Sequence, residues 1–174
     1  MSYRNQLKYT RDHNSCYNKY MPNKRKRKAL IGTVKTETDI FVSATKLSDK
    51  FLSEANKLLS IWGMTTLQYS ALRVLYVKDS RDEGLPSKEI GQSLYTRVPD
   101  VTRLLDRMVD KGWVTRERDL VNRRVVRTRL TQIGIELVES AYKPLLELES
   151  KQLNHMTEEE KQTLLTLLGK ALTG

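Results

Sequence analysis

Residues 85–131 read LPSKEIGQSLYTRVPDVTRLLDRMVDKGWVTRERDLVNRRVVRTRLT, and this stretch decides the fold of the chain. Its apolar residues between positions 99 and 111 recur at helical spacing: Val101, Leu104, Leu105 and Met108. A helix with this spacing buries one face against its own domain and leaves the opposite face polar. Pro99 suits the first turn of such a helix, and Thr96 is the expected cap upstream.

The polar face carries short hydrogen-bonding side chains and long cationic ones, the mixture that reads base edges and binds phosphates in a major groove. Its members are Asp100, Thr102, Arg103, Asp106, Arg107 and Asp110. A shorter helix over residues 87–94, capped by Ser87, is expected just upstream and contributes Ile90 and Leu94 to the same core. Two helices in this order, the second with a polar outer face, predict a helix-turn-helix.

The period changes from helical to alternating after Gly112, which is expected to end the second helix. Two strands are predicted, over residues 113–118 and 124–130, joined by a polar turn at residues 119–123. A two-stranded ribbon with arginines at its tip is a wing. Thr131 follows the ribbon and is expected to cap the next helix.

The segment GWVTRERDLVNRRVVRTRLTQIG, residues 112–134, resembles the wing signature of the MarR family of bacterial transcriptional regulators. The order of elements agrees from about Glu37 to the C-terminus. This chain has Asn122 where the family's wing has aspartate, so the carboxylate charge is lost there. The resemblance implies DNA contacts from the second helix, its approach and the wing, at Thr96, Arg97, Asp100, Thr102, Arg103, Asp106, Arg107, Arg118, Arg123 and Arg124. It also implies a homodimer on double-stranded DNA, with repression the commoner mode.

The predicted fold class is mainly α, a winged helix-turn-helix with a two-stranded wing and long N- and C-terminal dimerisation helices. Residues 37–62 carry an apolar stripe at helical spacing, and a capping box formed by Thr157 and Glu160 begins a final helix that is apolar around much of its circumference. The first of these helices is longer than its own winged domain can cover, so it packs either on the C-terminal helices of the same chain or on a second chain. The final helix points to an intertwined dimer interface. The sequence predicts three parts of the chain. Residues 1–29 form a disordered basic arm, residues 30–63 and 131–174 form the dimerisation region, and residues 64–130 form the DNA-binding domain. Pro144 is expected to kink the helix that follows Thr131.

The net charge of +10 is segregated along the chain. Residues 1–28 carry nine Lys or Arg and one acidic residue, and residues 97–129 carry ten against five. The remaining segments are balanced or acidic, so the pattern favours a polyanion on one face. The arm is expected to lie on phosphates or in a minor groove. The alternatives are a solvated tail, a start at Met21 or, in a eukaryote, a nuclear localisation signal, but the resemblance favours a bacterial host.

A helix over residues 65–78 carries Tyr69, Arg73 and Tyr76 on one stripe, beside core positions that include Leu67, Ala71, Val74 and Leu75. Two aromatic rings with a guanidinium between them suit an aromatic carboxylate, with Trp62 lining the same cleft. The resemblance implies a site for small aromatic ligands between the dimer helices and the winged domain. Tyrosines at this spacing are more often packing residues, and that alternative stays open.

Several classes are disfavoured by what the sequence lacks. It has no glycine-rich phosphate loop and no nucleophile beside a histidine, so an enzyme is not expected. A single cysteine, Cys16, and two distant histidines predict neither a disulfide nor a metal site, and no cofactor is expected. Redox sensing by Cys16 is a minor alternative. No apolar run approaches a membrane span, so the protein is expected in the cytoplasm, associated with the bacterial nucleoid.

Two functions of different classes remain open on the sequence. The first is a dimeric, sequence-specific regulator whose DNA binding responds to a small aromatic ligand. The second is a winged-helix architectural protein of low sequence specificity, dominated by its basic arm. The ratio of affinity for a palindromic site to affinity for random DNA at one salt concentration separates the two.

Overall fold

The structure is a computed structural model that describes residues 36–80, 83–119 and 122–173. The chain divides into two compact units, residues 1–47 and 48–174. The elements in chain order are α3 (Thr36–Leu59), η1 (Ser60–Trp62), α4 (Thr66–Lys78), β1 (Leu85–Pro86), α5 (Ser87–Ser93), α6 (Val101–Asp110), β2 (Val114–Arg118), β3 (Val126–Leu130), α7 (Gln132–Gln152) and α8 (Glu158–Thr173). A mainly α winged helix-turn-helix is confirmed. The expected basic arm lies outside the residues that the structure describes.

The first unit contributes residues 36–47, the N-terminal half of α3. Its apolar side chains Ile40, Phe41 and Val42 are exposed. In the second unit α3 continues to Leu59, which is fully buried. A 3-10 turn and Gly63 then end the helical segment as the sequence predicted, because Gly63 adopts a left-handed conformation with φ of 65°.

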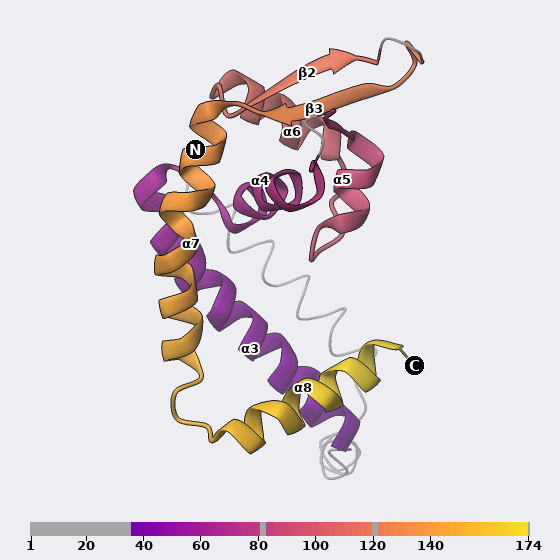
Figure 1. Cartoon of the computed structure of the whole chain (residues 1–174). Coiled ribbons are helices and arrows are strands. Elements are labelled where there is room, and N and C mark those ends of the chain that lie inside the picture. The colour runs from indigo at the N-terminus through magenta and orange to yellow at the C-terminus, as the bar shows by residue number, and fades with distance from the viewer. Residues whose placement is uncertain (1–35, 81–82, 120–121, 174) are drawn as a thin grey trace, which may run out of the picture. The chain divides into compact units, whose positions relative to one another are not determined.

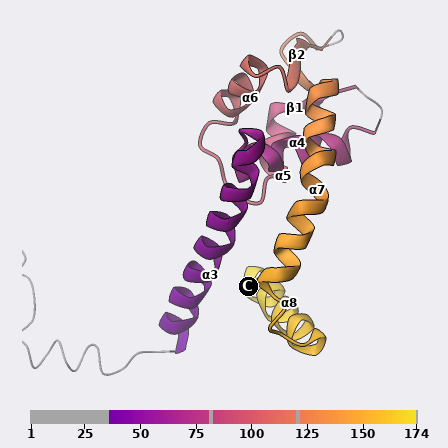
Figure 2. The same cartoon turned by 90° about the vertical axis from the view of Figure 1, so that its left-hand side faces the viewer.

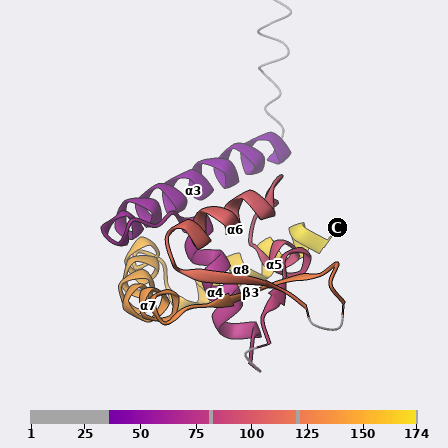
Figure 3. The ribbon, with the colours of Figure 1, turned by 90° about the horizontal axis from the view of Figure 1, so that it is seen from above.

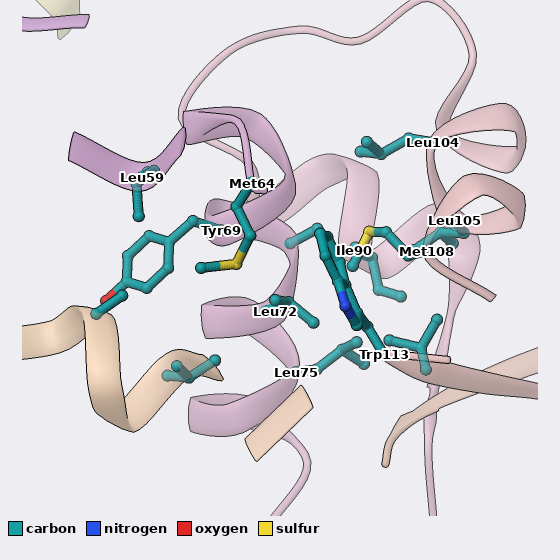
Figure 4. Packing of buried hydrophobic residues seen from close by; sticks show 14 of the residues in the cluster. Leu59, Met64, Tyr69, Leu72, Leu75, Ile90, Leu104, Leu105, Met108 and Trp113 are labelled. Atoms are coloured by element: carbon teal, nitrogen blue, oxygen red, sulfur yellow. The ribbon is translucent and has the colours of Figure 1, made fainter. Parts of the chain in front are cut away.

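Helix α4 is the centre of the second unit's core (Figure 4). It begins at a capping box in which the Gln68 N–H donates to the Thr65 hydroxyl and the Thr65 N–H donates to the Gln68 side chain. Ala71 and Leu75 are buried as predicted, and Leu72, which the sequence pattern left off the core face, is also fully buried. A helix with apolar contacts on several sides is surrounded by other elements, and α4 contacts α5, α7 and β3.

The two helices of the helix-turn-helix are confirmed, but both begin differently from the prediction. The N-cap position of α5 is Pro86 and not Ser87, and no side chain forms a capping hydrogen bond there. Helix α6 begins at Val101 with Asp100 as its cap, so Pro99 and Thr96 lie outside it. The buried face of α6 consists of Leu104, Leu105 and Met108, as predicted, and Val101, which was predicted with them, is half-buried against the core. Gly112 ends the segment with φ of 70°.

The wing is part of a three-stranded antiparallel sheet in the order β1-β3-β2. Figure 1 shows the ribbon of β2 and β3, and Figure 3 shows it from above. The predicted pair is confirmed, with Val114 opposite Leu130 and Arg118 opposite Val126. The short strand β1 was not predicted, because two residues carry no readable alternation. It joins the start of α5 to the wing, so the ribbon is anchored to the helix-turn-helix on its β3 side.

Helix α7 runs beside α4 and leads through a turn into α8 (Figure 2). The Thr131 hydroxyl accepts from the Gly134 N–H at 3.1 Å, which confirms Thr131 as the cap of α7. The helix is continuous through Pro144. The predicted capping box of α8 is present, since Thr157 and Glu160 exchange hydrogen bonds of 2.8 and 3.2 Å. No residue of α8 between 158 and 173 is buried.

Candidate nucleic-acid interface and ligand cleft

Helix α6 presents a polar face opposite its buried one. Thr102, Arg103 and Arg107 are exposed, while Leu104 and Leu105 on the other side are buried. Residues three and four positions apart share one face of a helix, so Arg103 and Arg107 project together. This face can offer two guanidiniums and a hydroxyl to a groove.

Asp100 is not a free member of that face. Its carboxylate accepts a hydrogen bond of 2.9 Å from the Arg103 backbone N–H, so it caps the helix. Thr96 and Arg97 lie in the preceding loop and are exposed. With Lys88 of α5 they line a hollow of about 630 Å³ that also includes the first turn of α6. The sequence pattern did not predict Lys88 as a cation of this surface, since a lone lysine on a short helix has no periodic signal.

Asp106 also has a partner inside the protein. Its carboxylate forms an ion pair with the guanidinium of Arg116 on β2. Arg116 was absent from the predicted set of DNA-binding residues, and Asp106 was in it. The two lie ten positions apart on different elements, and pairing between elements is invisible to periodicity. The structure therefore makes Asp106 a link between α6 and the wing.

The wing carries Arg118, Arg123 and Arg124 as exposed side chains. Its turn is built on Asp119, whose carboxylate accepts from the Asn122 N–H at 2.8 Å. Asn122 in turn accepts a hydrogen bond of 3.2 Å from the Arg124 backbone N–H. Asn122 thus holds the backbone of the turn, and no hydrogen bond joins it to a guanidinium among the residues that the structure describes. The apolar residues 120 and 121 lie outside that part of the chain.

Arg127 links the turn of the wing to Gly84, just before β1. Its guanidinium is ion-paired with Asp119 and donates to the carbonyl of Gly84 at 2.9 Å. The hydrogen bond to Asp119 is the largest cause that raises the pKa of Arg127, so its charge is retained. Gly84 is required at this contact, because a Cβ there would lie 2.8 Å from Cγ of Arg129 and its φ is 76°.

A second hollow, of about 420 Å³, lies between α3, α4 and α7 within the second unit. Tyr69 and Arg73 line it, as the sequence predicted for a ligand cleft. Leu52 and Leu145 are among its apolar walls, and Glu149 adds a carboxylate. Burial is the first cause that raises the pKa of Tyr69, while the charge of Arg73 lowers it and that of Glu149 raises it. Both charges therefore act at the Tyr69 hydroxyl.

The other two predicted ligand residues lie elsewhere. Tyr76 lines a separate hollow of about 380 Å³ with Arg73 and Glu139, and its hydroxyl donates to Glu139 at 2.9 Å. That hydrogen bond raises the pKa of Tyr76. Trp62 lines neither hollow and packs against the core. The four predicted ligand residues therefore do not line one hollow: Arg73 lines both, Tyr69 and Tyr76 line one each, and Trp62 lines neither.

Tyr95 lines the second hollow although the sequence pattern did not include it. It belongs to the loop before α6, and its neighbours Thr96 and Arg97 line the first hollow. One short loop thus contributes to both hollows. An isolated tyrosine in a loop carries no periodic signal, so only the fold could reveal this placement.

Within the described ranges, no cluster of three or more His, Cys, Asp or Glu side chains could hold a metal ion. Across those ranges no helix is both long and apolar enough to pass through a membrane. Cys16 lies outside the residues that the structure describes, and His155 is exposed.

Comparison with known proteins places this geometry among DNA-binding regulators. Residues 64–126 match the model of the MarR family. The chain is 26% identical over 127 residues to YpoP, an uncharacterized HTH-type transcriptional regulator of Bacillus subtilis (strain 168), and the match covers 72% of this chain and 85% of that protein.

Two solved structures with similar folds contain DNA. A mutant MarR from E. coli complexed with operator DNA has a TM-score of 0.70 and 26% identity, covering 77% of this chain and 94% of that one. The S. aureus MepR–DNA complex has a TM-score of 0.69 and 27% identity, covering 80% and 98%.

Proposed function

The chain belongs to the MarR family and is a winged-helix transcription regulator of MarR type, and on that basis we propose that it binds operator DNA as a homodimer and acts as a repressor. Helix α6 enters the major groove, and the wing arginines contact the backbone and the minor groove. Repression follows when the bound protein blocks transcription. The family's proteins regulate transcription, so no catalytic role is assigned.

One observation carries the proposal. Arg103 and Arg107 project from the exposed face of α6, whose other face is fixed in the core, and the exposed Arg118, Arg123 and Arg124 stand on the adjoining wing. A rigid helix carrying paired guanidiniums supports direct readout of guanine, worth about 1–3 kcal/mol of discrimination for each bidentate contact. Arginines on a stiff ribbon support readout of a narrow, A·T-rich minor groove.

Exposed leucines on α8 support the dimer. Leu165 is 64% exposed and Leu172 is 86% exposed, and no residue of the helix between 158 and 173 is buried. The first turns of α3 likewise expose Ile40 and Phe41. Apolar helices left uncovered in a single chain are typical of an intertwined interface. Residues 30–63 and 131–174 are the proposed dimerisation region, and two-fold symmetry sets the recognition helices about 34 Å apart.

The second hollow is the proposed ligand site. Apolar walls, the Tyr69 hydroxyl and the Arg73 guanidinium suit a small aromatic acid. The Glu149 carboxylate in the same wall opposes an anion, which predicts weak binding. The ligand acts by releasing the protein from DNA.

The remaining parts of the proposal concern the arm and the cell. Residues 1–29 add phosphate contacts that are independent of sequence, consistent with their charge. The protein then resides in the cytoplasm on the nucleoid.

The experiment selects preferred sites from random DNA in vitro and compares the selected site with random DNA at one salt concentration. The expected affinity ratio is at least about 10³. Arg103→Ala should relax the preference at the centre of each half-site, whereas Arg123→Ala should weaken binding most where the flanks are A·T-rich. A ratio near one for the parent protein would refute sequence-specific regulation and favour the architectural alternative.

Asn122→Asp tests the wing turn separately. If a carboxylate at this position orients Arg123, the aspartate variant should prefer A·T-rich flanks more strongly than the parent does. If the added charge only repels phosphate, all sites should weaken alike. Equal relative affinities of Arg123→Ala and the parent for flank variants would exclude the wing from minor-groove readout.

A further inference from the structure

Arg116 differs from the other arginines of β2 and the wing tip because it is turned into the protein. Its side chain is 17% exposed, whereas Arg118, two positions along the same strand, is exposed. The guanidinium pairs through Nη1 with Asp106 on α6 and donates from Nη2 to the Ser87 hydroxyl on α5 at 3.3 Å. One side chain thus bridges the wing and both helices of the helix-turn-helix.

The opposite strand completes the surroundings of Arg116. Thr128 faces it directly in the β2–β3 ladder and is fully buried. Directly opposed residues project to the same side of a sheet. Arg116 Nε and Thr128 Oγ1, a donor and a potential acceptor, are both buried without a hydrogen-bond partner. A cation held in such a place is costly unless a carboxylate compensates it.

Asp106 is that carboxylate. It lies on the exposed face of α6 that carries Thr102, Arg103 and Arg107, here called the reading face. It is three residues from Arg103 and four from Thr102, so it shares their face. Its side chain is 55% exposed, which leaves it within reach of a bound polyanion. An unpaired carboxylate at this position would repel phosphate, or would accept a hydrogen bond from the amino group of cytosine.

We propose that Asp106 and Arg116 form a specificity-determining pair in which neither side chain contacts DNA. Arg116 neutralises a carboxylate on the reading face and sets the angle between α6 and the wing. This proposal rests on the proposed function, and it replaces the expectation that Asp106 reads bases. Arg116 is a positioning residue, since it acts through Asp106 and Ser87.

Charge rescue tests the pair. Arg116→Met should weaken binding to the selected site by about tenfold or more, because it frees a carboxylate against phosphate, and should add a preference for cytosine. Arg116→Met combined with Asp106→Asn should return affinity to within about threefold of the parent, since no free carboxylate remains. Arg118→Met is the matched control, because it removes one exposed charge from the same strand. The weaker binding of that control should not be recovered by Asp106→Asn.

A second measurement needs no DNA. Urea unfolding midpoints are compared for Asp106→Asn, Arg116→Met and the double variant. Asp106→Asn should lower the midpoint by leaving Arg116 without its counter-charge, and adding Arg116→Met should raise it again. The proposed pair would be refuted if the midpoint shifts of the two single variants add up to the shift of the double variant. It would also be refuted if the double variant binds DNA no better than Arg116→Met does. A parent protein that does not distinguish DNA sequences, together with non-additive midpoints, would refute the proposed function and leave standing only the structural coupling of Asp106 and Arg116.

Discussion

Substitutions at Asp100 can separate its role as a helix cap from a role in reading bases. Its carboxylate accepts from the Arg103 N–H at 2.9 Å, and the backbone at Asp100 is outside the helical region, with φ of −137° and ψ of 84°. Asp100→Ala removes the acceptor and should cost about 1 kcal/mol of unfolding free energy, the usual worth of an N-cap. Asparagine caps as well as aspartate does, so Asp100→Asn should cost little.

The DNA assay extends the same comparison. If α6 frays at its first turn in the alanine variant, binding must reorder that turn, and affinity should fall by up to about fivefold, the equivalent of 1 kcal/mol. Asp100→Asn should bind at least as well as the parent, because it keeps the cap and removes a negative charge near phosphate. Unfolding is followed by circular dichroism in urea, and binding by fluorescence anisotropy. Equal destabilisation by the two variants would refute the capping role, and a changed base preference in Asp100→Asn would restore the reading role.

Three further predictions concern the arm, the ligand and the dimer. Deleting residues 2–28 should weaken binding to all DNA sequences alike and reduce the salt slope by about 0.9 for each phosphate that the arm no longer neutralises; unchanged binding to random DNA would make the arm a solvated tail. Arg73→Ala should abolish release from DNA by salicylate without changing affinity in its absence, while Glu149→Gln should lower the salicylate concentration needed. Charged residues at Leu165 and Leu168 should prevent folding, because interface and core coincide in an obligate dimer; light scattering that finds a folded monomer would contradict this.

Much of the winged domain could be predicted because its signals are local. Leu104, Leu105 and Met108 recur at helical spacing because one face of their helix is buried in the core. Thr131 and Gly112 act on their own backbone, as a cap and as a residue with positive φ. The wing pair follows from alternation and a polar turn. Each of these features depends on residues a few positions apart, which is the range over which sequence patterns carry information.

The features that could not be predicted depend on residues far apart in the sequence. The ion pair of Asp106 with Arg116, which comes from another element, was not predicted. Nor was the hydrogen bond from the Tyr76 hydroxyl to Glu139, 63 positions away. The strand β1, which was not predicted, exists only because β3 passes beside Leu85. Partners distant in sequence decide whether a polar side chain is available, and no local pattern reports them.

The loop before α6 gives the proposed regulation a physical route. Tyr95 lines the ligand hollow, Thr96 and Arg97 line the hollow beside α6, and Asp100 caps the helix. A ligand can change DNA affinity only by as much as its own affinity differs between two positions of the protein. An aromatic acid that contacts only Tyr69 and Arg73 meets the same walls in both positions and changes nothing, however tightly it binds. Release by salicylate therefore requires that the bound acid also contacts the Tyr95 ring, because that ring is the part of the hollow joined directly to the recognition helix.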